Sequence, residues 1–138
     1  MTPQQRSREW LTKAGYLVGT VEQWTRFPSK VPPFKTVQIR KDLFGFADVI
    51  AVRPGAVFLL QVTSGANASA RVEKLLNDRE VAPNVLKCLQ AGIRIAVHSW
   101  AKQGARGERK LWKIRVQEIT AEMICVPVQA LCAAEEAF

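Results

Sequence analysis

The chain has 138 residues, of which 48% are hydrophobic and 23% charged, a composition typical of one globular domain. No apolar run approaches the roughly 20 residues of a membrane-spanning helix, and the N-terminus lacks the apolar stretch of a signal peptide, so we expect a cytoplasmic protein. The formal net charge of +8 favours a polyanionic partner over a merely soluble surface, because each phosphate neutralised releases condensed counterions. Three widely spaced cysteines among apolar residues indicate reduced core thiols, not a disulfide framework or zinc site.

The N-terminal third predicts a helix, a strand and a long loop. Thr2 and Pro3 supply a helix start and Gly15 a stop. Residues 16–24 are then typical of a strand. Residues 25–41 combine three prolines with basic side chains, which predicts a long irregular loop of the kind that often carries function.

Two apolar runs flank the turn signal Pro54-Gly55 and predict a β-hairpin. Symmetrical pairing about that turn places Asp48 opposite Gln61, with Cβ atoms roughly 4.5–5.5 Å apart. Thr63 lies two residues further along the strand and therefore points to the same face. Polar groups gathered in an otherwise buried hairpin cost stability, so they indicate a functional site.

The rest of the chain predicts helices and then strands. A turn at 64–67 precedes a helix with Val72, Leu75 and Leu76, which Asn67 or Ser69 can cap, and a helical continuation ends near Gly92. Residues 93–98 and 111–116 alternate as strands, and His98, the only histidine, lies in an apolar strand where no catalytic role is expected. We predict one domain over 1–138, with a core at about 5–118 and a helical closing segment at 119–138.

This arrangement resembles the PD-(D/E)XK nuclease superfamily, in which an Asp and an acidic-x-Lys triplet on consecutive strands bind a divalent metal. Asp48 matches the first position, Gln61 the acidic position and Thr63 the lysine position, while Ala47 stands in place of Pro. The chain is most similar to archaeal Holliday junction resolvases, the VRR-NUC group and small phage-borne proteins with Gln-Val-Thr. The resemblance implies an α/β fold: a restriction-endonuclease-like αβββαβ core with a mixed central sheet flanked by helices.

The resemblance also implies a Mg²⁺ or Mn²⁺ site. Asp48 would supply an anionic oxygen, with neutral oxygens from the Gln61 amide and the Val62 backbone carbonyl. Asp42 is either a second carboxylate ligand or a loop residue in an Asx-turn. Glu9 is a weaker candidate for an acidic residue of the first helix, the alternative being a solvated helix face.

The sequence lacks the lysine of the superfamily, because Thr63 can hydrogen-bond a water but carries no charge. Arg71 and Lys74 share a helix face and offer a substitute cation, and Lys74 suits proton chemistry better. The alternatives are that Lys74 faces solvent and that Arg71 binds a DNA phosphate.

Basic residues outside the metal site predict a DNA-binding surface. They cluster around the last two strands, where Trp100 and Trp112 are expected mostly to pack. The candidates for nucleic-acid binding are Lys41, Arg71, Lys102, Arg106, Arg109, Lys110 and Lys113.

The predicted function is a Mg²⁺- or Mn²⁺-dependent endonuclease that acts on DNA, with branched or phage DNA as candidate substrates. Because Gln61 and Thr63 depart from the superfamily pattern, the alternative is a nucleic-acid-binding module of the same fold that has lost hydrolysis. A weaker alternative is a protein-interaction factor of a phage or mobile element. The likeness to the resolvases makes a homodimer a candidate assembly.

Overall fold

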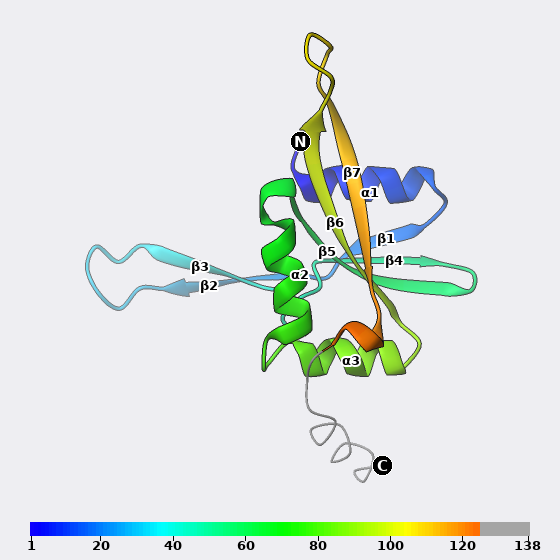
Figure 1. Cartoon of the computed structure of the whole chain (residues 1–138). Helices are drawn as coiled ribbons and strands as arrows, with labels where there is room; N and C mark the ends of the chain where they lie inside the picture. The colour runs from blue at the N-terminus through cyan, green and yellow to red at the C-terminus, as the bar shows by residue number, and fades with distance from the viewer. Residues whose placement is uncertain (125–138) are drawn as a thin grey trace.

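A mixed sheet with helices on both faces forms the centre of the computed structural model, which describes residues 1–124 (Figure 1). Its five strands follow the order β1-β4-β5-β6-β7. Their bounds are β1 Leu17–Thr20, β4 Val49–Arg53, β5 Ala56–Ser64, β6 Arg94–Gln103 and β7 Leu111–Ile119. Strands β5 and β6 are parallel and the other neighbours antiparallel. The predicted α/β class with a mixed, helix-flanked sheet is confirmed.

The helices bury the two faces of this sheet. α1 (Pro3–Lys13) begins after Thr2, as the sequence predicts, and Thr2 and Gln5 form a capping box there. Its Leu11 packs on one face of the sheet. α2 (Ala68–Asn77) and α3 (Ala82–Gln90) form the crossover between the parallel strands and cover the other face. The larger core layer, on the α2 and α3 side, includes Phe46, Leu59, Leu75, Val85, Ile95 and Val97.

The predicted hairpin has the predicted register. Arg53 pairs with Ala56 and Val49 with Leu60, and Gly55 takes the positive φ of +85° that the tight turn requires. Just outside this first pair, Asp48 precedes Val49 and Gln61 follows Leu60, and the Asp48 N–H donates to the Leu60 carbonyl.

Residues 25–41 are not the irregular loop that the sequence predicted. They form most of a separate two-stranded antiparallel sheet of β2 (Gln23–Pro28) and β3 (Thr36–Lys41), here called the arm, which projects from the main sheet (Figure 1). The prolines permit this because Pro28 ends β2, while Pro32 and Pro33 lie in the connection between the strands. The predicted strand 16–24 is accordingly two strands, separated at residues 21–22.

Three further expectations are corrected. Asn67 precedes α2 but makes no capping bond, because it belongs to the 3₁₀ turn Gly65–Asn67 and has φ −101° and ψ 0°, not the extended backbone of an N-cap. Its Nδ2 donates to Ser64 Oγ at 3.2 Å. The helical continuation is a separate helix, α3, since Asp78 Oδ1 accepts from the backbone N–H groups of Glu80 and Val81 and forms a turn between the helices.

Strands β6 and β7 extend beyond the predicted ranges as a long hairpin. In the predicted closing segment, Ala121–Met123 is a 3₁₀ turn, and 125–138 lie outside the described residues.

A buried polar network fastens α1 to β6. Ser7 is fully buried, with its hydroxyl 3.1 Å from His98 Nδ1, and it accepts a hydrogen bond from Trp100 Nε1 at 2.8 Å. Burial lowers the pKa of His98 to about 4, so the ring is neutral at physiological pH. His98 and Trp100 therefore have structural partners on the α1 side of the sheet.

Cys88 is a buried free thiol, and burial raises its pKa. Cys125 and Cys132 lie outside the described residues. Among residues 1–124, no helix has the length and apolar character needed to cross a bilayer.

Candidate functional site

Asp48 is the buried centre of the candidate site. Its N–H donates to the Leu60 carbonyl at 3.0 Å, and its carbonyl accepts from the Val21 N–H at 3.0 Å and from Gln4 Nε2 at 3.4 Å. Its carboxylate accepts from the Val62 N–H, at 3.2 and 3.3 Å to the two oxygens. Only 3% of the residue is exposed. Backbone contacts to β5 and to the segment after β1 therefore fix the position of this carboxylate.

The length difference between two strands explains why the carboxylate lies here. β5 continues to Ser64, whereas the ladder with β4 starts at Val49 and Leu60, so the Val62 N–H has no ladder partner on that side. The Asp48 side chain accepts this N–H instead. Because the N–H and C=O of one strand residue point to the same side of the strand, the Val62 carbonyl also points toward the side of Asp48. The strand end thus offers an oxygen donor beside the carboxylate.

Two more carboxylates flank the base of the arm. Glu22 immediately precedes β2 and Asp42 immediately follows β3, and their side chains are 9% and 11% exposed. Arg40 Nε lies 3.6 Å from Glu22 Oε2 and 3.6 Å from Asp42 Oδ1. Among residues 1–124, neither of these two oxygens accepts a hydrogen bond. Both carboxylates are therefore shielded from water, and each has an oxygen without a hydrogen-bond donor among the described residues.

The turn at Gly45 lies directly between Asp42 and Asp48. The Gly45 N–H donates to the Asp42 carbonyl, and Phe44 and Gly45 have φ of +56° and +83°. A non-glycine residue at positive φ is uncommon and is stabilised only by its surroundings. Here Leu43 forms a bridge with Ala47 that closes the turn. This turn returns the chain from Asp42 to the start of β4.

The carboxylates act on one another. Burial is the main cause that raises the pKa of Asp48 to about 7, and the Val62 N–H opposes it. The negative charges of Asp42 and, more weakly, Glu22 raise the pKa of Asp48 further, while Arg40 lowers it. The group holds three acidic side chains and a single arginine that acts on Asp48, so a further cation would stabilise it.

Gln61 adds an unsatisfied neutral oxygen. The residue is 1% exposed, and its Oε1 has no hydrogen-bond partner among the described residues. An unpaired buried polar atom costs about 1–3 kcal/mol and calls for a physical reason. Thr63 lies on the same face and pairs with Ser99 of β6, and both are buried. Oxygen-bearing side chains therefore line the face of β5 and β6 beside Asp48.

The oxygen atoms of the site are of the kinds that a hard divalent cation prefers. Within residues 1–124, no group of three or more Asp, Glu, His or Cys side chains is arranged as metal ligands. The candidate donors are an anionic oxygen of Asp48, the unpaired amide oxygen of Gln61 and the Val62 carbonyl, and Asp42 is the carboxylate that acts most strongly on Asp48. Mg²⁺ needs only one or two carboxylates and usually keeps several waters.

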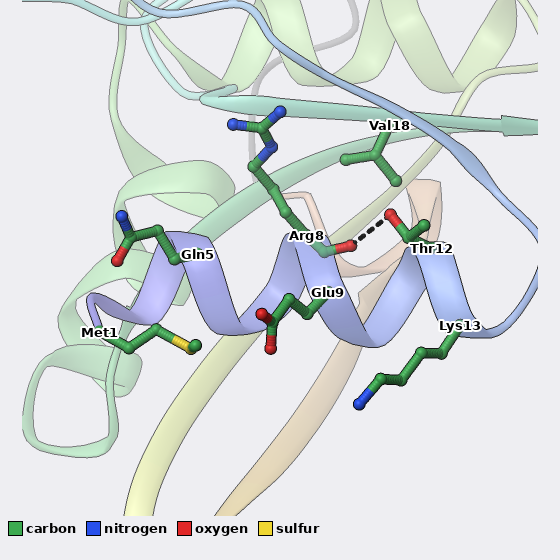
Figure 2. A pocket seen from close by; sticks show the side chains of 7 residues that line it. All are labelled: Met1, Gln5, Arg8, Glu9, Thr12, Lys13 and Val18. Carbon is green, nitrogen blue, oxygen red and sulfur yellow. Dashed lines mark hydrogen bonds between the residues drawn. The ribbon is translucent and has the colours of Figure 1, made fainter.

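Glu9 lies on the solvated face of α1. It lines a shallow surface depression of about 570 Å³ together with Met1, Gln5, Arg8, Thr12, Lys13 and Val18. Figure 2 shows Glu9 and Lys13 pointing away from Val18. The α1 residue that reaches the candidate site is Gln4, through the Asp48 carbonyl. Glu9 therefore lies on a solvated helix face, which was the alternative to a role as an acidic site residue.

The cation that acts on Asp48 is Arg40 of β3. Sequence interpretation missed both Arg40 and Glu22, because a loop at 25–41 gives no reason to bring its two ends together. The signal was present, since two acidic residues flank the basic segment 23–41. Arg71 and Lys74 are half-buried on α2, and a role for either at the metal site remains a prediction.

The predicted DNA-binding residues lie mostly on one projecting element. Lys102, Arg106, Arg109, Lys110 and Lys113 are exposed along the β6–β7 hairpin, which extends beyond the helices (Figure 1). Trp112 on this hairpin has Arg6 at 4.1 Å and Lys102 at 5.5 Å from its ring centroid. Lys41 is exposed at the base of the arm. The candidates thus divide between the β6–β7 hairpin, the arm and α2.

The fold and site together define an α/β protein with a mixed sheet and a buried cluster of oxygen donors at the start of β4. A scan of protein-family models, a search of curated proteins and a search of solved structures each find no match to this chain.

Proposed function

We propose that this protein is a Mg²⁺- or Mn²⁺-dependent endonuclease that hydrolyses phosphodiester bonds in DNA. The observation that carries the proposal is the buried and unpaired Gln61 Oε1, which lies just beyond the first pair of the β4–β5 ladder, at the end where Asp48 lies. Burial raises the pKa of Asp48 to about 7. Groups with strongly perturbed pKa values and unsatisfied polar atoms concentrate at functional sites. The basic surface supports a nucleic acid as the substrate.

The side chains of the site have separate roles in this proposal. Asp48 and Gln61 would hold the metal together with the Val62 carbonyl, and Asp42 would add a second carboxylate. When bound, the metal lowers the pKa of a coordinated water and stabilises charge on the scissile phosphate. The Thr63 hydroxyl can orient a water by hydrogen bonding. Arg40 supplies positive charge next to the carboxylates.

An inactive DNA-binding module is the second candidate, and one specific observation favours it. Arg40 already lies 3.6 Å from both Glu22 and Asp42, so part of the negative charge is neutralised without a metal. Thr63, in the position of the superfamily lysine, is buried and uncharged. Both candidates share the basic surface, so hydrolysis must be measured to distinguish them.

A cleavage assay tests the proposal. Purified protein is incubated with branched, single-stranded and duplex DNA in Mg²⁺, Mn²⁺ or EDTA. We expect metal-dependent products that disappear in EDTA, and Asp48→Ala should lower the rate at least about 100-fold while DNA binding persists, since removing a ligand abolishes water activation and leaves the basic surface intact. Glu73→Ala is the matched control, because it removes the same charge from an exposed position on α2.

One set of results would rule out the endonuclease function. If wild type, Gln61→Glu and the Gln61→Glu/Thr63→Lys double variant are all inactive on every DNA form with either metal, the binding module replaces it.

DNA binding should be strongly salt-dependent. Removing the charge of Lys102, Lys110 or Lys113 is expected to weaken binding across sequences and to reduce the slope of log affinity against log salt by about one unit for each phosphate that the variant no longer neutralises. Lys87→Ala is the control, since Lys87 is exposed on α3, which lies far from the tip of the β6–β7 hairpin (Figure 1). Affinity that does not change with salt would contradict both the nuclease and the binding module.

A further inference from the structure

The arm has almost no core of its own. Every residue of β2 is exposed, including Trp24 at 59% and Phe27 at 51%. A two-stranded ribbon is marginally stable alone in water, so one with large exposed aromatic side chains calls for a partner. Its residues 23–41 contain no acidic side chain and have five basic ones: Arg26, Lys30, Lys35, Arg40 and Lys41. This charge matches a polyanion.

The register of the arm separates two faces. Trp24 pairs with Arg40 and Arg26 with Gln38, and these pairs share one face, here called the tryptophan face. Gln23 pairs with Lys41 and Thr25 with Ile39, and these pairs share the opposite face with Phe27. The tryptophan face therefore combines an aromatic ring, two guanidinium groups and an amide, which are the groups that stack on bases and bind phosphates.

The tryptophan face continues into the candidate metal site. Glu22 and Asp42 occupy the positions just beyond the Gln23–Lys41 pair, so strand alternation places them on the side of Trp24 and Arg40. The contacts agree, because Arg40 Nε lies 3.6 Å from a carboxylate oxygen of each residue. A strand bound along this face would approach Glu22 and Asp42 at the base of the arm.

We propose that the tryptophan face of the arm binds an unpaired DNA strand, with a base stacked on Trp24 and a phosphate on Arg26, and so directs the strand toward the carboxylates. The inference deepens the proposed function and rests on it. It makes the substrate class DNA with unpaired nucleotides, such as single strands or branch points. Stacking on Trp24 requires a free base face, which a duplex does not offer within its length.

Phe27 provides a matched control for Trp24. Both are exposed aromatic residues of β2, three residues apart and on opposite faces of the same ribbon. Binding of single-stranded and duplex oligonucleotides is measured in EDTA, where no cleavage occurs. Trp24→Ala should weaken single-strand binding by about fivefold or more and duplex binding far less, and Trp24→Phe should restore most of the affinity. Phe27→Ala should change neither affinity.

A second variant tests the phosphate contact without changing the Trp24 side chain. Arg26→Gln leaves Trp24 in place and should reduce the salt slope for single-strand binding by about one unit. Equal decreases in affinity for Trp24→Ala and Phe27→Ala, or unchanged single-strand binding in both Trp24→Ala and Arg26→Gln, would overturn the inference. A second copy of the chain covering the arm, detected as a dimer that Trp24→Ala dissociates, would also overturn it. If the binding results hold and metal-dependent cleavage is absent, the nuclease function fails and the binding surface stands.

Discussion

Asp48→Asn is expected to raise the free energy of unfolding at pH 8 by about 4 kcal/mol in the absence of metal. Burial raises the pKa of Asp48 from 3.8 to about 7, so ionising this carboxylate opposes folding. The folded protein binds more protons than the unfolded chain between these values, and stability falls as pH rises through this range. Asparagine can still accept the Val62 N–H but does not ionise.

Urea unfolding of wild type and Asp48→Asn from pH 4 to pH 8 measures this effect. The difference should be small at pH 4, grow until about pH 7 and then stay constant. The lowered pKa of His98 has the opposite consequence, a loss of stability as pH falls from 6.5 to about 4, but it is common to both proteins and cancels in the difference. A difference that does not vary with pH would show that Asp48 is ionised throughout and would remove the electrostatic argument for the site.

Gln61→Glu should strengthen Mg²⁺ binding by about tenfold or more. The substitution adds a carboxylate beside Asp48, where the amide oxygen is buried and unpaired. A hard cation binds an anionic oxygen more strongly than a neutral one. Without metal, the added charge should lower the melting temperature at pH 8, because it is buried near existing carboxylates.

Thermal unfolding with and without Mg²⁺ measures both parts of this prediction. The melting temperature of Gln61→Glu should rise more on Mg²⁺ addition than that of wild type, since a ligand that binds the folded state stabilises it by mass action. Gln90→Glu on the exposed end of α3 is the matched control and should respond like wild type. Equal Mg²⁺ responses in the two variants would mean that Gln61 does not face the cation site.

The central hairpin could be predicted from the sequence because its signals are local. Pro54-Gly55 defines the turn, and two apolar runs of matching length determine which residues oppose each other. Counting outward from the turn then gives the pair Val49 and Leu60, with Asp48 and Gln61 just outside it. The helix start at Thr2 and Pro3 and the helix stop at Gly15 are local signals of the same kind.

The rest of the candidate site depends on contacts between distant segments. Glu22 and Arg40 meet only because β2 and β3 pair, and prolines near the turn concealed that pairing. The contact from Gln4 to Asp48 depends on how α1 packs on the sheet, which the Ser7, His98 and Trp100 network helps to fix. Helix periodicity defines a buried face but not which polar residue reaches across to a strand.

Calorimetric titration of Mn²⁺ into the metal-free protein at pH 8 measures whether Asp48 binds a divalent metal. At this pH most Asp48 carboxylates are ionised, so little binding energy is lost to proton release. We expect a single saturable site in wild type, loss of that site in Asp48→Ala, tighter binding in Gln61→Glu and unchanged binding in the exposed control Glu73→Ala. Identical titrations of wild type and Asp48→Ala would contradict a divalent-metal site at the start of β4.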